Sequence, residues 1–102
     1  GVAFLANSAT NIYTPAASTI YTILKRIHLC NVTSQPAQFT LYIGGTGGSA
    51  SGTELFKTKT IGPFDTYDYP CNRKMLSTDF LTGLASAAST ITIDVEGEQV
   101  VV

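Results

Sequence analysis

The chain has 102 residues and a formal net charge of −1, with 13% charged and 44% hydrophobic residues. A chain of this length forms one domain, and this apolar content is typical of a packed globule. The few lysines and arginines are scattered, so the sequence lacks the basic face that nucleic-acid binders present. It also contains no apolar run of about 18 residues, which excludes a membrane-spanning helix.

The N-terminal stretch is apolar and precedes the first proline. We interpret residues 1–14 as an N-terminal arm or edge strand and residues 15–102 as a β-sandwich domain. An apolar arm is costly to expose to water. We therefore expect Val2, Phe4 and Leu5 either to pair within the domain or to dock onto a neighbouring molecule.

The longest ordered stretch runs from Thr19 to Val32. Ile27 and Leu29 alternate with more polar neighbours, which predicts a strand with one face inward. A helix over Ile20 to Leu29 is the rival interpretation. The β-branched residues and the flanking turn residues argue against that helix.

The next segment, Gln38–Ile43, alternates clearly. Phe39, Leu41 and Ile43 are expected to face the core, and Tyr42 is expected to face outward. A short turn separates this strand from the preceding one, so the two strands are predicted to form a hairpin.

A glycine-rich run from Gly44 to Gly52 is expected to be an exposed, mobile loop. The strand Glu54–Ile61 follows, and a second strand, Phe64–Tyr69, is expected to end at Pro70. Two short extended pieces are expected at Lys74–Leu76 and Asp79–Leu81.

The C-terminal part begins with small residues from Gly83 to Ser89, which predict a loop. Thr90–Glu96 gives the clearest alternation, with its Ile and Val residues inward and its acids outward. Gly97-Glu98 is expected to turn the chain, and Gln99–Val102 to continue as a terminal strand. Altogether the sequence predicts an all-β fold, a single antiparallel β-sandwich of jelly-roll or Ig-like type with about eight short strands.

The sequence shows no set of residues that supports catalysis. The single histidine, His28, could activate a catalytic serine, but the sequence contains no Gly-x-Ser-x-Gly elbow that would present one. A zinc site would need more ligands than His28, Cys30 and Cys71 provide, and the two cysteines are expected to be reduced thiols. We therefore expect no enzyme activity, no metal site and no cofactor.

Three further patterns resemble ligand motifs. Gly45–Ala50 matches Gly-x-Gly-x-x-Ala, but a strand follows it where the dinucleotide motif requires a helix. Asp65, Asp68 and Asp79 could bind calcium if the loops brought them together, although solvated carboxylates are the simpler interpretation. Asn31-Val32-Thr33 is a glycosylation sequon.

Three tyrosines are candidates for an interaction surface. Tyr42 is expected to point outward on its strand, and Tyr67 and Tyr69 share one face of theirs. Tyrosine is enriched at interfaces because its ring provides contact area and its hydroxyl stays polar. The alternative is that these rings cover a sheet or close the rim of the sandwich.

Three stretches carry a resemblance to a known group of proteins: Tyr21–Asn31, Phe39–Gly44 and Ala85–Gly97. They resemble small β-sandwich structural proteins of tailed bacteriophages, of the capsid decoration or minor capsid type. In such proteins a strand ending in Ile-His-Leu-x-Asn precedes a hairpin, and a segment of small residues leads to a Thr-rich final strand. The resemblance spans about four fifths of the chain, from Pro15 to Gly97.

The resemblance implies a non-catalytic virion protein, assembled in the host cytoplasm, that binds the lattice of the major capsid protein. A neck or tail protein is the other location that it implies. The neutral outward strands are expected to form a homo-oligomer, for example a trimer. The alternative function is a carbohydrate- or receptor-binding module of a tail, in which the three tyrosines stack on sugar rings.

Overall fold

The computed structural model describes residues 3–8, 10–13, 19–44 and 54–101. These residues form β-strands, turns and irregular segments, and none of them belongs to a helix that could cross a membrane. The predicted interface residue Val2 and the glycine-rich run 45–52 lie outside the described residues. The strands are β1 (Ala3–Phe4), β2 (Thr10–Tyr13), β3 (Thr19–Asn31), β4 (Ala37–Gly44), β5 (Glu54–Ile61), β6 (Thr66–Leu76), β7 (Phe80–Ala85) and β8 (Ile91–Val101).

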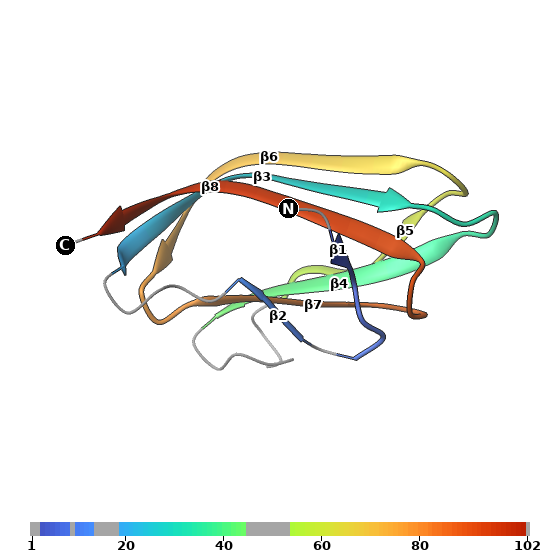
Figure 1. Ribbon diagram of the computed structural model, residues 1–102, viewed down its shortest axis with the longest axis horizontal. Helices are drawn as coiled ribbons and strands as arrows, with labels where there is room; N and C mark the ends of the chain where they lie inside the picture. The colour runs from blue at the N-terminus through green and yellow to red at the C-terminus, as the bar shows by residue number, and fades with distance from the viewer. Residues whose placement is uncertain (1–2, 9, 14–18, 45–53, 102) are drawn as a thin grey trace.

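The strands form two antiparallel sheets that lie one above the other (Figure 1). The first sheet has the order β1-β8-β3-β6 and the second has the order β2-β7-β4-β5. The pairing is symmetric about the middle of the chain, so that the first strand pairs with the last and the two middle strands pair with each other. The pairs are β1 with β8, β2 with β7, β3 with β6, and β4 with β5. A long two-stranded ribbon rolled up in this way is a jelly roll. The predicted all-β antiparallel sandwich is therefore confirmed, in its jelly-roll form.

Alternating side chains from both sheets fill the space between them. Ile27 and Leu29 of β3 are buried, as are Ile91 and Ile93 of β8, and Phe39 of β4 faces them from the other sheet. The strand predicted at Thr19–Val32 is thereby confirmed and its helical rival excluded, because residues 19–31 form one extended strand. Burial of these side chains supplies the main driving force for folding.

The predicted hairpin between the third and fourth strands is wrong. β3 belongs to the first sheet, where it pairs with β6 and β8, whereas β4 belongs to the second sheet, where it pairs with β5 and β7. The connection through residues 32–36 crosses from one layer to the other. Alternation alone could not reveal this, because a strand shows the same pattern whether its neighbour in sequence lies beside it or faces it.

Two predicted strand ends, at Pro70 and at Gly97, are also wrong, because β6 and β8 run through them. β6 is an edge strand, and Pro70 pairs with Arg26 directly after a bulge, where Cys71 and Asn72 of β6 lie against the single residue Lys25 of β3. An edge position tolerates the missing N–H of proline. Gly97 lies within the β8 ladder, where an added Cβ would come within 2.8 Å of the Ile23 carbonyl oxygen.

The predicted loop of small residues from Gly83 to Ser89 is wrong in its first part, because β7 extends to Ala85. Gly83 is buried in this strand. A Cβ at this position would lie 2.6 Å from Leu41 Cδ2 and 2.8 Å from Ile12 Cδ1. The glycine therefore permits close packing inside the sandwich instead of marking a turn.

Candidate functional site

The N-terminal segment pairs within the domain. Ala3 and Phe4 pair with Ile93 and Thr92, and the Leu5 N–H donates to the Ile91 carbonyl at 2.8 Å. Leu5 is buried in the core, whereas 55% of Phe4 is exposed. Of the predicted arm residues that the structure describes, Phe4 thus presents an apolar side chain at the surface and Leu5 does not.

Tyr67 and Tyr69 of β6 pack between the sheets. Both rings meet Phe56 edge to face, with centroids 5.5 Å and 4.9 Å away, and Phe39 lies 6.1 Å from Tyr67. Tyr42 is half-buried on β4, opposite Thr82 of β7. Tyr67 and Tyr69 therefore share one aromatic cluster on the inner side of β6, and the structure does not bring Tyr42 into it.

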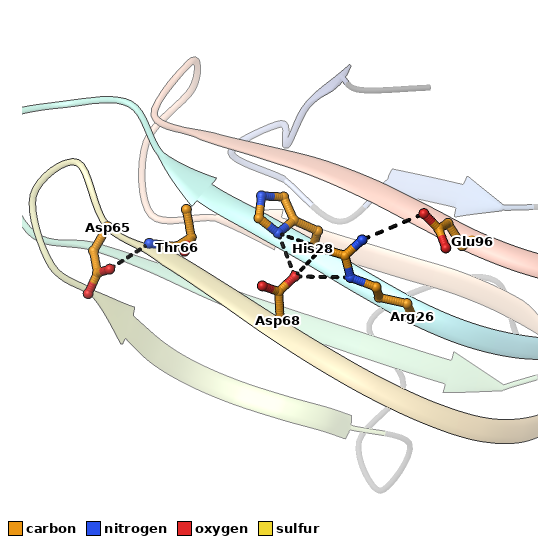
Figure 2. A network of polar contacts seen from close by, with 6 residues as sticks. All are labelled: Arg26, His28, Asp65, Thr66, Asp68 and Glu96. Carbon is orange, nitrogen blue, oxygen red and sulfur yellow. Dashed lines mark hydrogen bonds and ion pairs between the residues drawn. The ribbon is translucent and has the colours of Figure 1, made fainter.

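A polar network crosses the outer face of the first sheet (Figure 2). The Asp68 carboxylate on β6 accepts a 2.7 Å bond from Arg26 Nη2 and lies 2.6 Å from His28 Nδ1. Arg26 Nη1 also lies 3.6 Å from the Glu96 carboxylate on β8. β3 thus carries the two basic side chains, and its two neighbouring strands supply the acids.

The contacts in this network shift the pKa values of Asp68 and Arg26. The hydrogen bond from His28, followed by the bond from Arg26, holds the pKa of Asp68 below its usual value, while Asp68 raises the pKa of Arg26. An ionised carboxylate can only accept, so His28 carries its proton on Nδ1. Asp68 is 47% and Arg26 42% exposed, and at such exposure these pairs fix orientation more than they add stability.

The end of the sandwich near the C-terminal end of β3 has a second and more buried arrangement, centred on Asn31. Its side-chain Nδ2 donates to three carbonyls, those of Gln35 at 2.7 Å, Ile61 at 3.0 Å and Gly62 at 3.1 Å. Its Oδ1 accepts from both the backbone N–H and the hydroxyl of Thr33. Asn31 is 0% exposed, so a glycan on this nitrogen is incompatible with the folded chain.

Asn31 joins two loops, residues 32–36 and residues 62–65, which we call the tip. The tip presents Phe64, 68% exposed, and Val32, 41% exposed. Phe64 has a φ of 53°, a left-handed conformation that bulky residues rarely adopt. An exposed apolar ring in an unfavourable backbone conformation gives the fold no stability, which makes Phe64 a candidate for contact with another molecule.

Sequence reasoning missed both tip residues. Asn31 was named only as part of a sequon and as the last residue of a strand pattern, and Phe64 only as the start of a strand. The signal that was available is the Gly62-Pro63 dipeptide directly before Phe64, because this dipeptide marks a turn or loop and so places Phe64 beside one.

The two cysteines are free and far apart. Cys71 packs against the core with its Sγ 3.2 Å from the Leu24 carbonyl, whereas Cys30 is six positions further along β3. Six strand residues span about 20 Å, far beyond the reach of a disulfide. In the described part of the chain no three His, Cys, Asp or Glu side chains gather into a metal site.

The three aspartates considered for calcium have separate roles. Asp68 belongs to the network on the outer face. Asp65 accepts from the Thr66 N–H at 2.8 Å, and Asp79 accepts from the Leu76 N–H at 2.9 Å. Each therefore supports its own strand or turn.

The sequence matches no protein-family model and no curated protein, and no solved structure matches the chain.

Proposed function

We propose that the chain is a non-catalytic structural subunit of a tailed-phage particle. It binds the major capsid protein as a decoration or minor capsid subunit. The observation that carries this proposal is the tip, where buried hydrogen bonds of Asn31 hold an exposed Phe64 in place. The stretches that resemble phage structural proteins supply the particle context.

The jelly roll suits a structural subunit. The domain extends 45 Å along its longest axis, and the loops at the ends of its sheets remain available for contacts. Jelly rolls occur in viral capsid proteins and also in lectins, so the fold supports the proposal by analogy only. On a lattice, many weak contacts add up to stable attachment through avidity when subunits are linked to one another.

The chemistry of the tip favours a protein partner. Asp65 is the single charged residue in residues 31–36 and 62–66, and no basic residue lies there to bind phosphate or anionic lipid. A weakly charged surface with one exposed aromatic ring fits an apolar recess on a protein. The partner contact therefore centres on Phe64, and Val32 is the other exposed apolar residue of the tip.

The alternative, a carbohydrate- or receptor-binding module, has less support. Its stacking residues would include Tyr67 and Tyr69, but these rings already pack against Phe56 between the sheets. Tyr42 and the exposed Phe64 are the aromatic residues that would have to carry such a role.

The test is quantitative mass spectrometry of purified particles of the phage that encodes this chain. The proposal predicts hundreds of copies per particle, the number that a repeating capsid lattice accommodates. A dozen copies or fewer would place the chain in the neck or tail, and its absence from particles would overturn the proposal.

A further inference from the structure

Within the described part of the chain, the outer edge of β8 is paired over only a short part of its length. β8 has eleven residues, and β1 covers it only opposite Thr92 and Ile93, with one more bond from Leu5 to Ile91. Figure 1 shows β8 running on past β1 to the C-terminal end. Among the described strands, none pairs with this edge from Val95 to Val100.

The backbone groups at this edge can be assigned from the ladder. The Leu5 N–H donates to the Ile91 carbonyl, so Ile91 directs its polar backbone groups toward β1. Because these groups alternate in direction along a strand, those of Val95, Gly97 and Gln99 point to the same side. The extra residues in the β3–β8 ladder lie in β3, which leaves the alternation in β8 regular.

An apolar cavity of about 480 Å³ opens next to this edge. Its lining includes the inward side of β8, from Ile93 through Val95 and Gly97 to Gln99, together with Leu24 of β3 and the β2 edge of the other sheet. At the far end Gln99 donates to the Tyr13 hydroxyl, which bonds Thr22 at 2.8 Å. An unpaired edge beside an unfilled space between two sheets is the arrangement that accepts an additional strand.

We propose that β8 binds an extended segment of a partner protein as an additional β-strand, with alternate apolar side chains of that segment in the cavity. A small apolar molecule would fill the cavity but would leave the edge N–H and C=O groups bonded to water alone. A partner strand would fill the cavity with its side chains and would bond the edge N–H and C=O groups with its own backbone. This inference does not depend on the proposed role in a phage particle.

The charge on the outward side of β8 specifies the partner further. Glu96 and Glu98 are exposed and alternate with the residues that line the cavity. If a second copy paired through its own β8, antiparallel pairing around Gly97 would place Glu96 opposite Glu98, an unfavourable contact between like charges. The partner segment is therefore expected to carry lysine or arginine at its outward positions and apolar residues at its inward ones.

The probe is a seven-residue peptide of alternating valine and lysine, with capped termini, titrated into the isotope-labelled full chain and followed by NMR. We expect saturable shifts of the Val95, Gly97 and Gln99 amides and slower hydrogen exchange at these positions. A peptide of alternating valine and glutamate serves as the charge control, and we expect it to bind about tenfold more weakly or less.

Matched variants locate the site. Gln99→Pro removes one N–H of the free edge, and we expect it to weaken peptide binding about tenfold, whereas Gln99→Ala keeps that N–H and should stay within about threefold. If Gln99→Pro does not fold, Glu98→Lys serves in its place and should weaken binding of the lysine peptide and strengthen binding of the glutamate peptide.

Three outcomes would overturn the inference. The first is an absence of shifts at the β8 edge when the peptide is in excess. The second is equal binding by Gln99→Pro and Gln99→Ala. The third is concentration-dependent broadening of the same amides without peptide, because that result would assign the edge to a second copy of the chain.

Discussion

The Phe64 backbone N–H donates to the carbonyl oxygen of Thr33 at 3.1 Å and so ties the loop after β5 to the loop after β3. These loops are 31 residues apart in sequence but form one surface, because β3 and β5 lie in opposite sheets that end together at the tip. Asn31 supports the same junction from inside the fold, since it bonds carbonyls in both loops.

Asn31→Ala should destabilise the domain by about 2–4 kcal/mol, because it removes several buried hydrogen bonds and leaves carbonyl groups without donors. Urea unfolding followed by circular dichroism measures this loss. Gln38→Ala, at an exposed position on β4, is the control and should change the free energy of unfolding by less than about 0.5 kcal/mol. Equal effects of the two substitutions would show that Asn31 does not hold the tip together.

Phe64→Gly should stabilise the isolated domain by about 1 kcal/mol, because glycine adopts a positive φ without steric cost. Leu76→Gly gives the comparison, since Leu76 is also an exposed apolar residue but lies at the end of β6, where glycine weakens the strand. Thermal unfolding should therefore show opposite signs for the two variants. A loss of stability in both would contradict the strained conformation of Phe64.

Gly83→Ala should cost about 1–3 kcal/mol, because the new methyl group meets Leu41, Ile12 and the Thr40 carbonyl in a packed interior. Gly62→Ala provides the matched control. The nearest atom to its added Cβ is 4.0 Å away, so we expect a change within about 0.5 kcal/mol. Denaturant midpoints of the two variants decide whether Gly83 is a packing residue.

Asp68→Asn should alter the pH dependence of stability. The pKa of Asp68 is lowered in the folded chain, so its contribution is present above the ordinary aspartate pKa of about 3.9 and is lost as the pH falls through the folded-state pKa. The stability difference between the native chain and Asp68→Asn should be largest at neutral pH and shrink in acid.

High salt should reduce the same difference, because the exposed pairs of Asp68 with Arg26 and His28 are screened. Urea unfolding at several pH values, with and without added sodium chloride, measures both effects. A difference that stays constant from neutral to acid pH would show that the network has no electrostatic influence on folding.

The sequence predicted the individual strands better than it predicted which strands pair with each other. Alternation correctly gave the inward faces of Ile27, Leu29, Ile91 and Ile93, because each strand buries one side whatever its position in a sheet. It could not assign β3 and β4 to different sheets, since pairing in a jelly roll joins residues far apart in sequence. Pro70 and Gly97 were misread as strand ends because their neighbours in the sheet, which make them acceptable, are not visible locally.

The candidate sites were harder to predict for a related reason. The polar network joins Arg26 and His28 to Asp68, forty positions or more along the chain, and Asn31 bonds carbonyls about thirty positions away. Phe64 looks like an ordinary strand residue until its positive φ and its exposure are known. Such features arise from tertiary contacts, which single-sequence patterns do not contain.

The most direct test of the proposed role of the tip is the binding of Phe64→Asn to phage particles that lack this subunit. Asparagine tolerates the left-handed conformation, so the variant should keep the fold while losing the aromatic ring. We expect the unsubstituted chain and Leu76→Asn to bind the particles with similar occupancy and Phe64→Asn to bind at least about tenfold more weakly. Full occupancy by folded Phe64→Asn would contradict the central role of Phe64.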